Sequence, residues 1–113
     1  MTLITSEANN QYLDLIDSFL SKGRDRAAVL LDEALDEARN IIGQNPTKGQ
    51  RYPAKYDKLV WQQVLWIQVH RYWFSFIVIR NEPIIFNIMW DSADIERRAN
   101  LPPDDSIDFN SLR

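Results

Sequence analysis

The stretch RYWFSFIVIRNEPIIFNIMWDSADIERR, residues 71–98, decides the fold that the sequence predicts. Two of its parts, RYWFSFIVI (71–79) and PIIFNIMW (83–90), are rich in the β-branched and aromatic residues that favour strands. Between them, Arg80-Asn81-Glu82-Pro83 has the composition of a turn, and proline is tolerated where a strand begins. The stretch therefore predicts an apolar β-hairpin that is followed by a charged exit.

Because the side chains of a strand alternate between the two faces of a sheet, the hairpin indicates how each face is used. In the first strand, one predicted face carries Tyr72, Phe74, Phe76 and Val78. The opposite face carries Trp73, Ser75, Ile77 and Ile79. In the second strand, one predicted face carries Ile84, Phe86, Ile88 and Trp90. The opposite face carries Ile85, Asn87 and Met89. Both faces are largely apolar, so helices cover one of them and the other needs a separate cover. A partner protein, the C-terminal tail and a second copy of the chain are the three alternatives.

The residues before the hairpin predict a short strand near Leu3 and Ile4 and then two helices. Ser6 is the expected N-cap of the first helix, and Gly23 ends it. The apolar residues of this helix recur at helical spacing, at Tyr12, Leu13, Ile16, Phe19 and Leu20. The second helix is expected from about Asp25 to Ile42, with Gly43 as its C-terminal signal. The short link between the helices predicts an antiparallel helical hairpin.

The segment QNPTKGQRYPAKYDK (44–58) reads as a loop, and LVWQQVLWIQVH (59–70) as a further strand. The predicted fold class is therefore α+β: a short N-terminal strand, a helical hairpin and a three-stranded antiparallel meander, with the helices packed on one face of the sheet. One domain over residues 1–99 precedes an acidic, proline-containing tail over 100–113. This tail is either disordered or lays Ile107 and Phe109 on the sheet.

Composition narrows the classes of function. The chain of 113 residues contains no cysteine and one histidine, which excludes disulfides and makes a zinc site unexpected. We expect no cofactor and no metal. We expect the start MTLITSEANN not to act as a signal peptide, because it lacks a basic region and a long apolar stretch. No apolar run reaches the roughly 20 residues that a membrane helix needs. A cytoplasmic protein without membrane contacts is the expectation.

The charges are unevenly distributed along the chain. Its formal net charge is −3, yet residues 47–80 contain six Lys and Arg against one Asp. A basic block beside aromatic strands is suited to contacts with phosphates. The alternative is ordinary solvated surface charge.

Four segments of the chain resemble the RelE/ParE superfamily of toxins from bacterial toxin–antitoxin pairs. They are YLDLIDSFL, NPTKGQRYP, HRYWFSFIV with its Tyr72, Phe74 and Phe76 pattern, and PIIFNIMWDSADIERR. The resemblance extends from about Leu3 to Arg98. It implies a compact α+β fold and a cognate antitoxin whose extended or helical segment wraps the toxin. A homodimer is a further possibility.

The resemblance implies two alternative activities. RelE-like members cut mRNA in the ribosomal A site with basic and tyrosine side chains, whereas ParE-like members bind DNA gyrase without hydrolysis. The sequence departs from the nuclease pattern, since Gln62, Gln63 and Gln68 stand where basic residues are usual. Asp91, Asp94 and Glu96 repel phosphate, and no His or Tyr follows Trp90. We therefore expect a ParE-like toxin, with a RelE-like endonuclease or a non-toxic interaction module of the same fold as alternatives.

The candidate site residues fall into three sets. The candidates for catalysis in the nuclease alternative are Arg71, Tyr72, Arg97 and Arg98. The candidates for binding the target or nucleic acid are Arg51, Lys55, Lys58, Arg80, Arg97 and Arg98. The candidates for contacts with a partner protein are Trp61, Trp66, Trp73 and Trp90. Ser92, Asp94 and Arg97 are expected to hold the turn after the last strand or to touch the target, and His70 is expected to be a surface or hydrogen-bonded residue.

Overall fold

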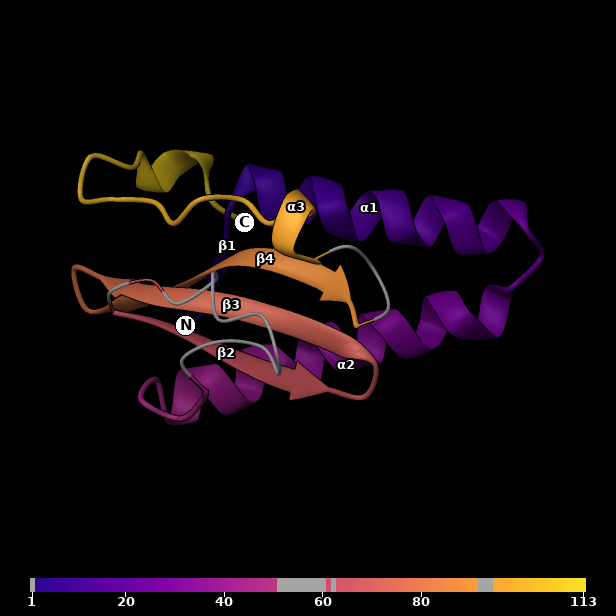
Figure 1. Ribbon diagram of the computed structural model, residues 1–113, viewed down its shortest axis with the longest axis horizontal. Coiled ribbons are helices and arrows are strands. Elements are labelled where there is room, and N and C mark those ends of the chain that lie inside the picture. Colours follow the sequence, from indigo (N-terminus) through magenta and orange to yellow (C-terminus); the bar gives the residue numbers. More distant parts are fainter. Residues whose placement is uncertain (1, 51–60, 62, 92–94) are drawn as a thin grey trace.

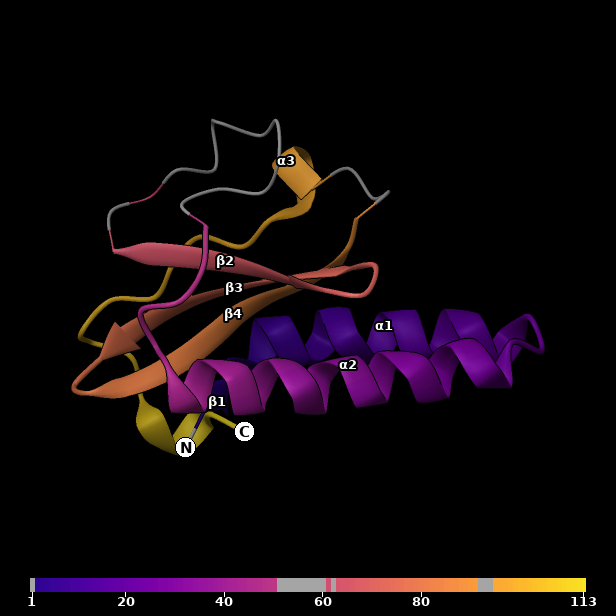
Figure 2. The same ribbon diagram turned by 90° about the horizontal axis from the view of Figure 1, so that it is seen from below.

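The computed structural model describes residues 2–50, 61, 63–91 and 95–113, and two layers make up the fold (Figure 1). The elements are β1 (Leu3–Ile4), α1 (Ser6–Ser21), α2 (Asp25–Gln44), β2 (Val64–Val69), β3 (Tyr72–Ile79), β4 (Glu82–Trp90), α3 (Ile95–Arg98) and the 3₁₀ turn η2 (Phe109–Ser111). The strand order is β1-β4-β3-β2. Figure 2 shows α1 and α2 side by side beneath one face of the sheet.

This arrangement confirms the α+β fold class, with one addition to the predicted meander. β2, β3 and β4 pair antiparallel as expected, but β1 joins the other side of β4 in parallel, through Leu3 with Ile84 and Ile4 with Ile85. The four-stranded sheet is therefore mixed. A parallel neighbour needs a long crossover, which the helical hairpin provides.

The ends of the helices differ slightly from the prediction. Thr5, not Ser6, is the N-cap of α1, because its side-chain oxygen accepts a hydrogen bond from the Ala8 amide at 3.1 Å. α1 ends before Gly23, which has a φ of +68°. α2 continues through Gly43 to Gln44, so Gly43 is not its C-terminal signal.

The hairpin of β3 and β4 contains a bulge that the alternation pattern did not predict. Ser75 pairs with Asn87, but the next residue, Phe76, pairs with Ile85, so Phe86 is an extra residue of β4. The predicted faces of β4 are therefore wrong. Ile84, Phe86 and Met89 lie on one face, and Ile85 and Ile88 lie on the face toward the helices.

The core on the helix face matches the prediction for β3. Tyr72, Phe74 and Phe76 are buried there, with Phe74 fully excluded from solvent. The helices contribute side chains at helical spacing, which include Ala8, Tyr12, Phe19, Leu31, Ala34, Leu35, Ala38 and Ile42. Val78 is exposed, so the apolar stripe of β3 ends before it.

The second face of the sheet is covered by the chain itself. Trp66, Trp73, Ile77 and Phe86 are buried in a second cluster, against which Ile107, Phe109 and Leu112 of the tail pack. Ile95 of α3 is fully buried in the same cluster. The tail is thus ordered on the sheet, which is one of the two expected alternatives.

The tail also closes the sheet at its β1 edge. The backbone amides of Ile4 and Arg113 each donate to the other residue's carbonyl, at 2.9 and 2.8 Å. At the other end of the tail, Arg80 Nη2 donates to the carbonyls of Asp105 and Ile107, at 2.7 and 3.0 Å. Within the described ranges, none of the helices has the length and apolar character that crossing a membrane requires.

Candidate functional site

The candidate site lies where β3 begins, β4 ends and α1 meets the link to α2. Trp90 is half-buried there between two other rings. Its ring centroid lies 5.4 Å from that of Phe19 and 6.1 Å from that of Tyr72, in tilted and edge-on geometry. Such arrangements are favourable for aromatic pairs. They hold the indole in place at the end of the sheet.

Two arginines surround this aromatic cluster. The guanidinium carbon of Arg24 lies 5.2 Å from the centroid of Phe19 and 5.9 Å from that of Trp90, which is cation–π geometry. Arg71 is exposed in the turn between β2 and β3. Both cations act on the phenol of Tyr72, where they favour the ionised form. We call Arg24, Arg71, Tyr72 and Trp90 the basic–aromatic end.

Burial dominates the chemistry of Tyr72. Its side chain is only 6% exposed, and desolvation raises the pKa of its phenol above the ordinary value, against the opposing charges of Arg24 and Arg71. The phenol is therefore neutral at physiological pH, and little of it is in contact with water.

The turn that carries Arg71 is held by neighbouring groups. The Asp91 amide donates to the Arg71 carbonyl at 2.8 Å, and Gln68 Nε2 donates to Asp91 Oδ2 at 3.3 Å. His70 has a φ of +55° and lies with its Nε2 3.5 Å from Glu37 Oε2 on α2. Both side chains of this last pair are more than half exposed, so the contact contributes little to stability.

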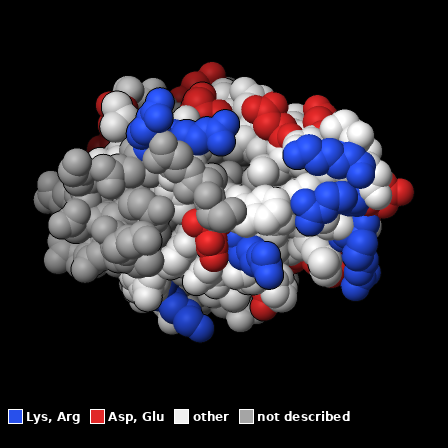
Figure 3. All heavy atoms as spheres, turned by 45° about the vertical axis from the view of Figure 1, so that its right-hand side comes forward, with Lys and Arg blue, Asp and Glu red and all other residues white. Residues whose placement is uncertain are grey.

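The space-filling view shows the charge around this end. In Figure 3, where the right-hand side of Figure 1 comes forward, several Lys and Arg side chains surround an uncharged patch. Asp and Glu side chains lie along the margin above it. Asp or Glu also borders the patch at its lower left, so its rim carries charges of both signs, with the cations gathered mainly on its right-hand side.

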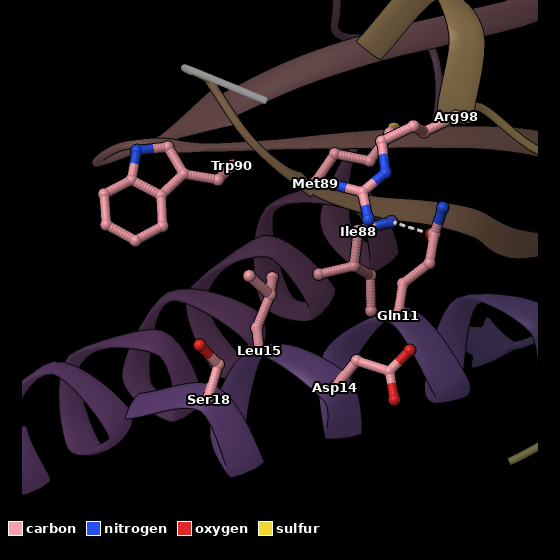
Figure 4. A pocket seen from close by; sticks show the side chains of 8 residues that line it. All are labelled: Gln11, Asp14, Leu15, Ser18, Ile88, Met89, Trp90 and Arg98. Carbon is pink, nitrogen blue, oxygen red and sulfur yellow. Dashed lines mark hydrogen bonds between the residues drawn. The ribbon is translucent and has the colours of Figure 1, made fainter. Parts of the chain in front are cut away.

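A pocket of about 280 Å³ adjoins the basic–aromatic end and shares Trp90 with it. Its other lining residues are Gln11, Asp14, Leu15 and Ser18 of α1, residues 88–89 of β4, and Arg98 of α3 (Figure 4). Arg98 and Trp90 therefore line the same pocket, although eight positions separate the two residues in the sequence.

The structure does not bring all of the predicted basic residues together. Arg80 is at the other end of β3, where it anchors the tail and lies 4.4 Å above the ring of Phe109. Arg97 and Arg98 belong to α3, and both are exposed. The remaining predicted positions, Arg51, Lys55, Lys58, Ser92 and Asp94, are outside the described residues.

The four tryptophans differ in their availability to a partner. Trp66 and Trp73 are 0% and 6% exposed, so neither presents a surface to a partner, contrary to the prediction. Trp61 is half-buried and stacks on Trp66 at 6.2 Å between centroids. Trp90 is the one of the four that combines partial exposure with a cationic neighbour within the described chain.

Sequence reasoning missed Arg24 and Phe19. The sequence pattern places Phe19 in the apolar stripe of the first helix, and Arg24, which follows Gly23 in the link between the helices, is not among the predicted site residues. Their contact with Trp90 joins positions about 70 residues apart, so no local pattern indicates it.

Among the residues that the structure describes, no group of three or more His, Asp or Glu is placed to hold a metal ion. Models of known protein families give no match to the chain, and no curated protein matches it.

Proposed function

We propose that this chain is a toxin of the RelE/ParE type that arrests growth by binding DNA gyrase, as ParE-like toxins do, and that a cognate antitoxin neutralises it. The order of elements supports this proposal. A short strand, a helical hairpin on one face of the sheet and three antiparallel strands form the fold that the resemblance implies. The proposal places the protein in the cytoplasm, where gyrase acts.

The observation that carries the choice of binding over cleavage is the environment of Tyr72. An RNA-cleaving site needs a group that exchanges a proton with the 2′-hydroxyl or the leaving oxygen. Tyr72 is buried and its pKa is raised by desolvation, so it is poorly suited to that role. Arg24, Arg71 and Trp90 meanwhile combine exposed guanidinium groups with a half-buried indole, which is the composition of binding hot spots.

A RelE-like endonuclease is the second candidate, and one observation favours it. Burial raises the pKa of Tyr72, but the charges of Arg24 and Arg71 oppose that rise, and two cations near a phenol could stabilise charge during phosphodiester cleavage without a metal. In that case Arg71 would stabilise the charged phosphate. A non-toxic interaction module of the same fold is the third candidate, and it needs no chemistry at the basic–aromatic end.

One pair of experiments separates the three candidates. The chain is expressed briefly without a partner, growth is recorded, and cellular mRNA is mapped by primer extension. The purified chain is then added to a gyrase supercoiling reaction. Growth arrest with intact transcripts and inhibited supercoiling is the expected result. New cuts within translated codons would establish the endonuclease, and normal growth with active gyrase would leave the interaction module.

The variant Arg24→Gln/Arg71→Gln tests whether the basic–aromatic end is the surface responsible. Both side chains are exposed, so their loss leaves the core intact. We expect the double variant to lose inhibition of supercoiling. Lys48→Gln is the matched control. Lys48 is exposed and lies in the segment after α2, so this substitution removes a positive charge that is not part of the basic–aromatic end. Full inhibition by the double variant would exclude this surface.

A further inference from the structure

The pocket between α1 and β4 has an apolar floor and two opposite charges at its rim. Leu15 and Trp90, both partly buried, supply the apolar surface, and Ile88 is almost fully buried between them on the same face of the sheet. Arg98 reaches toward this floor from α3, and Asp14 stands on α1 on the opposite side (Figure 4). A ligand that fits both parts carries an apolar group and charges of both signs.

Asp14 and Arg98 are available to such a ligand. Both are exposed, and in the described part of the chain no ion pair joins either of them to another side chain. Opposite charges on facing walls without a direct contact leave room for a molecule between them. The basic–aromatic end, in contrast, presents cations beside its rings, so the pocket is a separate site although it shares Trp90.

The backbone of β4 adds polar groups to the same wall. β1 pairs with β4 only at Ile84 and Ile85, so residues 88–90 have no neighbour on this side among the described strands. The Ile88 amide donates instead to Gln11 Oε1 at 2.8 Å. This bond shows that the Ile88 amide points away from β3, toward the unpaired side of β4. Since the amide and the carbonyl of one residue point to the same side of an antiparallel strand, the Ile88 carbonyl and, two residues later, the Trp90 amide face the pocket side.

We propose that this pocket binds the zwitterion of an apolar α-amino acid. Arg98 pairs with the carboxylate, Asp14 with the ammonium group, and the apolar side chain of the ligand lies on Leu15 and Trp90. At the edge of β4, the Ile88 carbonyl can accept a hydrogen bond from the ammonium group, and the Trp90 amide can donate one to the carboxylate. A phosphate dianion is disfavoured because Asp14 repels it, and a wholly apolar ligand would desolvate both charges without compensation.

The test is a titration of the isotope-labelled full chain, followed by the amide shifts of the pocket residues. Three probes differ in one group each: leucine, leucinamide without the carboxylate, and 4-methylpentanoate without the ammonium group. We expect leucine to shift the amides of the pocket and to bind about tenfold more tightly than either analogue, since each loses one charge-assisted pair.

Two variants assign the charges. Arg98→Gln should weaken leucine binding about tenfold and remove the preference over leucinamide, and Asp14→Asn should remove the preference over 4-methylpentanoate. Asp17→Asn, also exposed on α1 but not part of the lining, should change nothing. The proposal is overturned if leucine causes no shift up to its solubility limit, if an analogue binds equally well to the wild type, or if the two pocket variants bind leucine as the wild type does.

Discussion

Gln11 and Asn87 are joined by a hydrogen bond of 3.1 Å, although 76 positions separate them in the sequence. The bond ties α1 to the bulge of β4 at a residue that is fully buried. Asn87 uses all of its hydrogen-bonding capacity there, because its amide also donates to Ser75 Oγ and the Asn100 carbonyl and accepts from the Asn100 amide. Asn100 Nδ2 in turn donates to the Phe86 carbonyl at 3.0 Å.

Asn87→Leu should therefore destabilise the protein by about 2–4 kcal/mol, because several buried groups lose their partner at once. The free energy of unfolding from denaturant titration measures this. Asn110→Leu is the control, since Asn110 is exposed and bonds through its backbone. A loss from Asn87→Leu no larger than that of the control would mean that water replaces the missing bonds.

Phe74→Ala and Phe86→Ala compare the two faces of the sheet. Both side chains are at most 1% exposed, but Phe74 packs toward the helices and Phe86 toward α3 and the tail. We expect each substitution to cost about 3–5 kcal/mol. Thermal unfolding of both variants measures it. If Phe86→Ala left stability nearly unchanged and abolished partner binding, the second face would be a partner surface rather than core.

Gly49→Ala should be more damaging than Gly23→Ala. A Cβ at position 49 would stand 2.9 Å from the Trp66 carbonyl oxygen, where the Gln50 bridge holds the two segments together. A Cβ at position 23 would have no atom within 4 Å, so only the φ of +68° disfavours a side chain there. This backbone strain costs about 1 kcal/mol. Unfolding free energies of the two variants decide this. Equal losses would show that the segment around Gly49 moves away without cost.

Arg80→Gln should loosen the tail. The substitution removes two bonds to backbone carbonyls and the stacking on Phe109. We expect faster amide hydrogen exchange over residues 105–112 and a loss of about 1–3 kcal/mol. Arg26→Gln, an exposed arginine on α2, serves as the control. Unchanged exchange in this region would show that Ile107 and Leu112 hold the tail without Arg80.

Tyr12 makes stability depend on pH in alkaline solution. Burial, followed by the hydrogen bond that its hydroxyl donates to Asp32 Oδ1 at 2.6 Å, raises the pKa of Tyr12 from 10.0 to about 12. The folded state thus keeps a proton that the unfolded chain releases. This contribution is complete below pH 10 and is lost as the pH rises toward 12.

Tyr12→Phe should accordingly cost about 1 kcal/mol at neutral pH, through the lost hydrogen bond, and show a weaker fall in stability above pH 10 than the wild type. Denaturation at a series of alkaline pH values checks both. Parallel pH curves for the two proteins would assign the fall to other groups.

Local patterns predicted the elements, because helical and strand periodicity depend on a few neighbouring residues. The helical hairpin and the faces of β3 are confirmed for this reason. The faces of β4 were wrong because the bulge at Phe86 arises from pairing with Ser75 and Phe76, which a single strand does not reveal. Arg24 was missed for the same reason, since its role depends on where Trp90 lies.

The side of the sheet formed by β1 and β4 has a consequence for solubility. An open strand edge is a template on which other chains assemble into fibrils. Here Arg113 occupies the outer side of Ile4, while Asn100 and Gln11 bond the Phe86 carbonyl and the Ile88 amide of β4. Strand addition by another chain is therefore opposed at Ile4, Phe86 and Ile88, and we expect substitution of Gln11 or Asn100 to weaken this protection and to increase aggregation.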